Sequence, residues 1–163
     1  APAQRQGALD QAVADRKAQC ALAITLYDLM NQMTTVVDKM NDMRGSLDQR
    51  GTGLAARDSL MQALQRGSAQ VDTMRKKIVA TKEGGMITGE ERLRENLAEL
   101  YGSVVGYEGR PSEMQVERAG SISREMGDVS KDFARWIAIE LPRINKLLEG
   151  RGLARIEAAR VVP

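Results

Sequence analysis

The sequence contains no histidine and only one cysteine among its 163 residues. The lack of histidine excludes Ser-His-Asp and Cys-His catalysis, and also the Glu-x-x-His dimetal sites of many four-helix proteins. A single cysteine excludes an intrachain disulfide, and Cys20 has no neighbouring thiols or imidazoles for a zinc site. Its place beside apolar residues predicts a small, buried hydrophobic side chain. We therefore expect no catalytic residue, no cofactor and no metal in this chain.

Aromatic residues and long apolar runs are also scarce. Aromatics make up 3% of a chain that is 42% hydrophobic and has nine methionines, so the predicted core is aliphatic and rich in Met. No apolar run approaches the roughly 20 residues that a membrane-spanning helix needs, which predicts no membrane span. The first ten residues lack the apolar stretch of a signal peptide.

The chain also lacks an excess of either charge, since it has 24 basic and 22 acidic residues. The two signs alternate along the sequence, as on an ordinary solvated helix surface. A nucleic-acid-binding protein needs a one-sided basic patch, and the nearest candidate is the C-terminal group Arg151, Arg155 and Arg160. Glu149 and Glu157 dilute that group. We therefore predict no nucleic-acid partner.

Heptad spacing is abundant and predicts a long first helix over about residues 8–49. Its large apolar residues alternate steps of four and three, the 3.5-residue period of left-handed helix pairing. Residues 10–19 are poorer in large apolar side chains, so we expect them either to project beyond the bundle or to pack against something else. The apolar positions of this helix are Leu22, Leu26, Leu29, Met33, Val36, Met40, Met43 and Leu47.

Three further helices are predicted at about 54–81, 89–105 and 113–148, separated by glycine-containing links. The pairs Thr88 with Glu91 and Ser112 with Gln115 have the spacing of capping boxes and predict the last two helix starts. The apolar positions of these helices are Leu60, Leu64, Gly67, Val71, Met74 and Ile78; Leu93, Leu97, Leu100 and Val104; and Ile122, Met126, Val129, Phe133, Trp136 and Ile137.

The predicted fold class is all-α, because every periodic segment has the helical period. Short links favour antiparallel neighbours, so we predict an up-down-up-down four-helix bundle of residues 1–150. Pro142 predicts a kink in the fourth helix, and residues 151–163 are expected to be a loose tail or a docked strap. Gly67 lies on an apolar seam at a cost of about 1 kcal/mol relative to Ala. We explain it by the close approach of a bulky side chain such as Trp136.

Three residues near the third link are candidates for interaction with a partner: Tyr101, Tyr107 and Arg110. Tyrosine and arginine are favoured at protein interfaces. The alternative is that these side chains brace the loop between the third and fourth helices. The sequence leaves both interpretations open.

Residues 87–115 read ITGEERLRENLAELYGSVVGYEGRPSEMQ, and the preceding run over 75–82 reads RKKIVATK. This stretch resembles the C-terminal helical region of bacterial sialidase-repeat (BNR, sortilin-like) β-propeller proteins, which are often labelled glycosyl hydrolases. The helical organisation extends the resemblance to about 54–148. It implies that the chain is part of a longer, secreted or periplasmic polypeptide. It also implies that any glycan chemistry belongs to an upstream β-propeller, because no catalytic residue of the family transfers onto these positions.

Three functional hypotheses follow. The favoured one is a noncatalytic helical accessory module, whose partner is an upstream domain of the same polypeptide or another protein. The second is a free-standing bundle for ligand sensing or adhesion, which long heptad helices also suit. The third is a helical enzyme without histidine, as in helical chorismate mutases, although no paired Arg–Lys pattern resembling theirs is present.

Overall fold

The computed structural model describes residues 2–81 and 90–158, which form four α-helices and no strand. The prediction of an all-α, four-helix protein is confirmed. Within these residues, no helix is long and apolar enough to cross a membrane. The helices are α1 (Pro2–Gly51), α2 (Ser59–Ile78), α3 (Leu93–Val105) and α4 (Glu113–Glu149).

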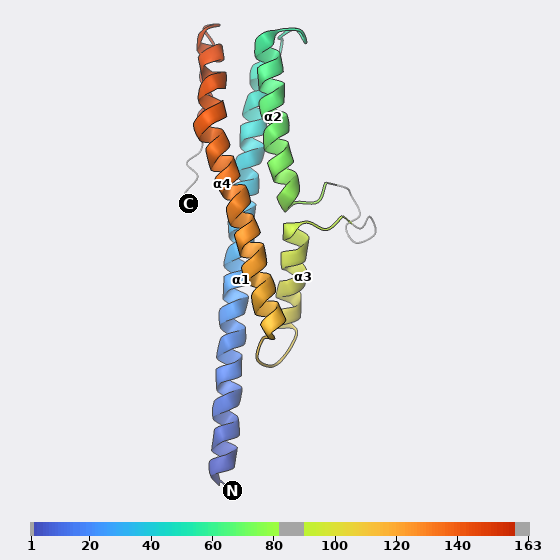
Figure 1. Ribbon diagram of the computed structural model, residues 1–163, viewed down its shortest axis with the longest axis vertical. Helices are drawn as coiled ribbons and strands as arrows, with labels where there is room; N and C mark the ends of the chain where they lie inside the picture. The colour runs from blue at the N-terminus through green and yellow to red at the C-terminus, as the bar shows by residue number, and fades with distance from the viewer. Residues whose placement is uncertain (1, 82–89, 159–163) are drawn as a thin grey trace.

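Helix α1 is the longest element, with 50 residues and a length of about 75 Å. It begins at Pro2 rather than near residue 8, in keeping with the preference for proline in the first turn of a helix. No residue between 3 and 18 is buried, and the lower part of α1 extends beyond the other helices (Figure 1). Of the two expectations for residues 10–19, projection is the one observed for residues 10–18 (Figure 1), whereas Gln19 is buried against α3.

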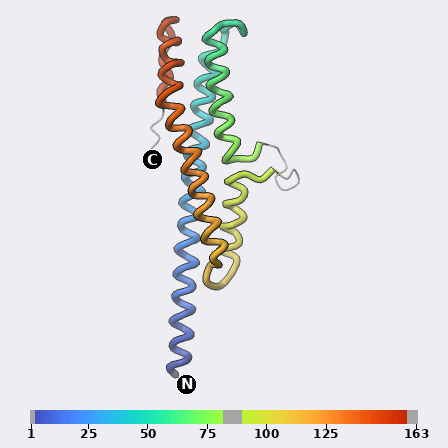
Figure 2. The backbone as a smooth tube through the Cα atoms, in the orientation of Figure 1, coloured from blue at the N-terminus to red at the C-terminus, as the bar shows by residue number. Residues whose placement is uncertain are grey.

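Helices α2 and α3 lie end to end and run in the same direction, opposite to α1 and α4 (Figures 1 and 2). Arg44, late in α1, pairs with Asp72 of α2 at 3.0 Å, whereas the early residue Gln19 contacts the last turn of α3. The predicted up-down-up-down order is therefore wrong for both α3 and α4, since the observed order is up-down-down-up (Figures 1 and 2). The physical reason is length: α2 and α3 have 20 and 13 residues, and together they match the 37 residues of α4. Stacked in this way, both short helices bury their apolar seams against the two long ones.

The core follows the predicted heptad positions. All predicted apolar positions of α2 and α3 are buried, and so are those of α4 except the half-buried Ile137. In α1, Leu22 and Val36 are only partly buried and Val37 is buried instead. A Cβ on Gly67 would lie 2.9 Å from Cδ1 of Ile144 and 3.2 Å from Cζ2 of Trp136, so the explanation of this glycine by close packing is confirmed.

Side-chain caps set three of the helix starts. Ser112 and Gln115 form the predicted capping box: the backbone N–H of Gln115 donates to Ser112 Oγ, and that of Ser112 to Gln115 Oε1. Thr88 lies outside the described residues, and α3 begins at Leu93 rather than near residue 89. The start of α3 is capped by Glu95, whose carboxylate accepts from the backbone N–H of Arg92. Helix α2 begins at Ser59 rather than near 54, because Asp58 accepts from the N–H of Leu60.

Helix α4 continues through Pro142 to Glu149, and the kink expected near Pro142 stays a prediction. After α4 the chain turns back, and Ile156 is 4% exposed and belongs to the core cluster. Of the two alternatives for the C-terminal residues, the docked strap is the correct one for the residues described up to 158.

Candidate interaction surface

The loop between α3 and α4 is held to α1 by one buried side-chain amide. Gln19 is 9% exposed, and its Nε2 donates to the carbonyl of Val104 at 2.7 Å and also to the carbonyl of Tyr107. The last carbonyls of a helix have no partner within that helix, so a side chain from a neighbour stabilises this end. The sequence did not indicate this role, because Gln19 lies among exposed polar residues of the projecting segment.

A hollow of about 480 Å³ lies beside this loop. Its lining combines an aromatic ring, a thioether and two guanidinium groups, the side chains enriched in protein interfaces. Tyr107 is 62% exposed and Met114 is 79% exposed, so both offer apolar surface to a partner. The lining residues are Leu100, Tyr107, Arg110, Ser112, Met114, Gln115 and Arg118.

Two of the three predicted interaction residues, Tyr107 and Arg110, line this hollow together. Tyr101 does not line it: this residue is half-buried and packs against the core, one turn before the end of α3. The loop is attached to α1 through the backbone carbonyl of Tyr107, so its ring is not needed for that attachment. Gln19 thus fixes the loop to α1, while the ring of Tyr107 lies beside Gly109 of the same loop and keeps 62% of its surface exposed. Whether these residues brace the loop or bind a partner stays a prediction.

The projecting part of α1 adds an apolar stripe to the same end of the molecule. Leu9 and Val13 are 61% and 53% exposed and lie with Cys20 on one open face of this helix. The prediction of a buried Cys20 is wrong, because this cysteine is exposed on the projecting helix. An ion pair of 3.0 Å between Arg16 and Glu108 joins the stripe to the α3–α4 loop. We call this stripe and the hollow beside the α3–α4 loop together the end surface.

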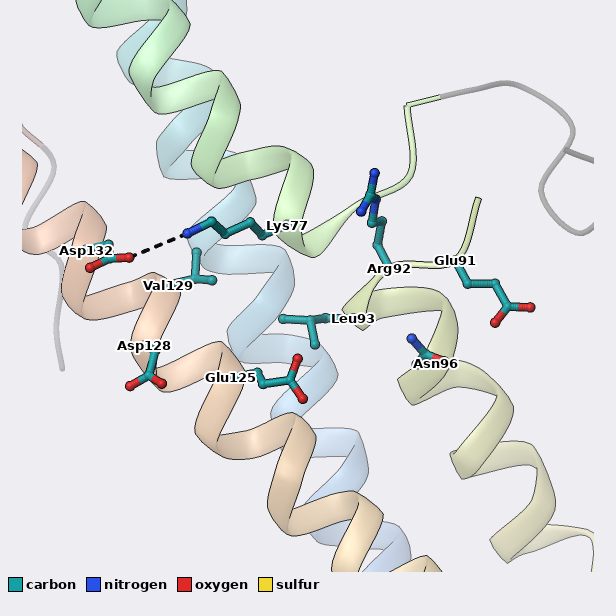
Figure 3. A pocket seen from close by; sticks show the side chains of 9 residues that line it. All are labelled: Lys77, Glu91, Arg92, Leu93, Asn96, Glu125, Asp128, Val129 and Asp132. Atoms are coloured by element: carbon teal, nitrogen blue, oxygen red, sulfur yellow. Dashed lines mark ion pairs between the residues drawn. The ribbon is translucent and has the colours of Figure 1, made fainter. Parts of the chain in front are cut away.

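Another hollow, of about 380 Å³, lies where α2 ends and α3 begins (Figure 3). Its floor is apolar, with Leu93 and Val129, and its rim is mostly acidic. Glu91 and Asp128 point away from each other, and Asp132 pairs with Lys77 at 3.7 Å (Figure 3). The carboxylates therefore do not converge on one point, as a shared proton or metal ion requires. Among residues 2–81 and 90–158, no group of three potential metal ligands lies close together.

A charged cluster joins α1 to α2. Asp72 receives ion pairs from Arg44, Arg75 and Lys76 at 3.0, 2.8 and 2.7 Å. Burial is the largest single influence on Asp72 and raises its pKa, but the hydrogen bonds from Lys76 and Arg75 and the charge of Arg44 together hold that pKa below its ordinary value. The cluster is thus a structural clamp with an ionised carboxylate at its centre.

No protein-family model, curated protein or solved structure matches this chain. A function is therefore inferred from the chemistry of the surfaces. Of these, the end surface exposes large apolar side chains beside arginines, whereas the acidic hollow is rimmed mostly by carboxylates and the Asp72 cluster consists of paired charges.

Proposed function

We propose that this chain is a noncatalytic helical module that binds an adjoining domain through its end surface. The observation that supports this is the projecting segment of α1, which is helical although none of residues 3–18 is buried, and which exposes Leu9 and Val13. Burial of such a side chain against a partner stabilises a complex by roughly 1.5–3 kcal/mol. Tyr107 and Arg110 lie at the same end and are the proposed anchor residues of the loop.

The proposed adjoining domain is an upstream β-propeller of the same polypeptide. This part of the proposal depends on the resemblance of residues 87–115 to the C-terminal helical region of sialidase-repeat proteins, and with it comes a secreted or periplasmic location. The N-terminus of α1 lies at the same end as the end surface (Figure 1), so a domain that precedes α1 is close enough to contact it.

The first test is the coding sequence immediately upstream of Ala1, where the proposal expects a β-propeller. The longer protein is then compared with the 163-residue chain by hydrogen exchange. We expect slower exchange in residues 3–18 when the upstream domain is present, because the domain covers the Leu9–Val13 stripe. The double substitution Leu9→Asp with Val13→Asp is expected to restore fast exchange.

Ala14→Asp is the matched control, since Ala14 is exposed on the same segment but outside the Leu9–Val13 stripe. It introduces a similar charge and is expected to leave the protection in place. A start codon immediately upstream of Ala1 would overturn the proposed partner. Equal hydrogen exchange of residues 3–18 in the longer protein and in the 163-residue chain would overturn the proposed contact.

A further inference from the structure

The strap that follows α4 is held by one buried side chain. Asn145 is 5% exposed, and its Nδ2 donates to the carbonyl of Ile156 at 3.0 Å. The backbone N–H of Ile156 donates in return to Asn145 Oδ1 at 2.8 Å. One amide side chain thus exchanges two hydrogen bonds with the backbone of a single residue, as a paired residue on a neighbouring strand does.

The strap lies in a groove on α4 whose surface is apolar beside Asn145. Ile137, Leu141 and Pro142 line a hollow of about 420 Å³ there, together with the strap itself. Ile156 is 4% exposed, so its side chain is the apolar anchor of the strap. Gly152 has φ 69, the left-handed conformation that glycine favours, and this lets the chain reverse into the groove.

Ala158 is half-buried against the core, and the remaining side-chain contacts of the strap are on the surface. Arg50 donates to the carbonyl of Arg155 at 3.3 Å, and Arg155 pairs with Glu149 at 3.2 Å, with both side chains of that pair more than half exposed. Exposed ion pairs contribute little to stability. The affinity of the strap for the groove therefore resides in Asn145 and in the pocket for Ile156.

We propose that the groove beside Asn145 is a binding site for an extended peptide with a branched aliphatic side chain, occupied in this chain by its own residues 153–158. Asn145 binds backbone atoms, which almost every residue offers, so selectivity comes from the apolar pocket. The tethered strap has an effective concentration in the millimolar range for a short linker. It therefore acts as a latch, and a peptide supplied in trans binds once the latch is weakened. The site lies toward the end of the molecule opposite the end surface (Figure 1), so it is independent of the function proposed above.

The test uses the full chain with Ile156→Ser and a fluorescein-labelled peptide that matches residues 152–158. Fluorescence anisotropy is expected to show that the peptide binds the variant. Its affinity for the unchanged chain is expected to be at least about tenfold lower, because the tethered strap competes with the peptide for the groove. Two matched peptides probe the contacts without any change to the protein. One carries N-methyl isoleucine, which removes the N–H that Asn145 accepts, and the other has Ser in place of Ile; neither is expected to bind.

Equal binding of the N-methyl peptide, or no binding of the original peptide to the folded variant, would overturn the proposal. Circular dichroism establishes whether the Ile156→Ser chain is folded. If it is not, the unchanged chain is mixed with an excess of each peptide, and exchange of the backbone N–H groups of 153–158 is measured. The original peptide is expected to speed this exchange and the N-methyl peptide to leave it unchanged; the same effect from both would contradict the site.

Discussion

At Gly67, the absence of a side chain sets how closely α2 approaches α4. An ideal Cβ at this position would contact Ile144 and Trp136 at 2.9 and 3.2 Å. The indole of Trp136 is fixed in turn, because its Nε1 donates to Gln70 at 2.8 Å. A methyl group at Gly67 can displace the flexible end of Ile144 more easily than it can displace this ring.

We predict that Gly67→Ala lowers the free energy of unfolding by about 1 kcal/mol. Overpacking costs about 1–3 kcal/mol, and the better helix propensity of alanine offsets about 1 kcal/mol of that. Gly127→Ala in α4 is the matched control, because nothing lies within 4 Å of a Cβ there. That variant is expected to gain up to about 1 kcal/mol. Urea denaturation measures both, and equal stabilisation of the two variants would contradict the packing argument.

Among the elements, the bounds of α4 and the buried face of α2 were predicted most completely, and the start and direction of α3 least (Figure 1). Heptad positions indicate which face of a helix is buried, and every predicted position of α2 is buried. The same positions carry no information on helix direction, because an apolar seam packs equally well in either sense. The direction of α3 depends on its match in length with its neighbours. The partners of Gln19 and Asn145 are backbone groups distant in sequence, so spacing could not reveal them.

The clamp between α1 and α2 makes stability depend on pH. We predict that Asp72→Asn lowers the free energy of unfolding by about 1 kcal/mol at pH 7, since the three ion pairs are only partly exposed and still screened by solvent. The folded-state pKa of Asp72 lies below the ordinary value of about 3.8 for an aspartate. The stabilisation is therefore complete above about pH 4 and is lost as the pH falls through the folded-state pKa.

Thermal unfolding of the unchanged chain and of Asp72→Asn between pH 7 and pH 2 measures this effect. The difference between the two is expected to shrink as the pH falls from 4 through the folded-state pKa, because below that pKa both have a neutral side chain at this position. Asp38→Asn is the control, an exposed residue of α1 outside the clamp, and is expected to change little at any pH. A difference that stayed constant down to pH 2 would show that Asp72 acts through packing rather than charge.

On the scale of the whole molecule, the two ends differ in how they are closed. At one end Arg151 pairs with Asp58 at the start of α2, and the strap covers α4. At the other end α1 continues alone past the α3–α4 loop (Figure 1). A helix without tertiary contacts is marginally stable in water, since most helical stability in proteins comes from packing of an apolar face. The projecting segment is thus the part of α1 whose order depends most on a partner.

We predict a steep gradient of hydrogen exchange along α1 in the isolated chain. Residues 3–18 open locally, whereas residues 26–47 open only with the core, so exchange is expected to differ by at least about a hundredfold. Mass spectrometry of peptides from the two segments measures this, and the second segment is the internal control.

The measurement is repeated at two protein concentrations. Uniform protection at both would mean that residues 3–18 are stable without a partner, whereas protection that grows with concentration would mean that a second copy covers the Leu9–Val13 stripe. Either result would contradict an end surface reserved for an adjoining domain.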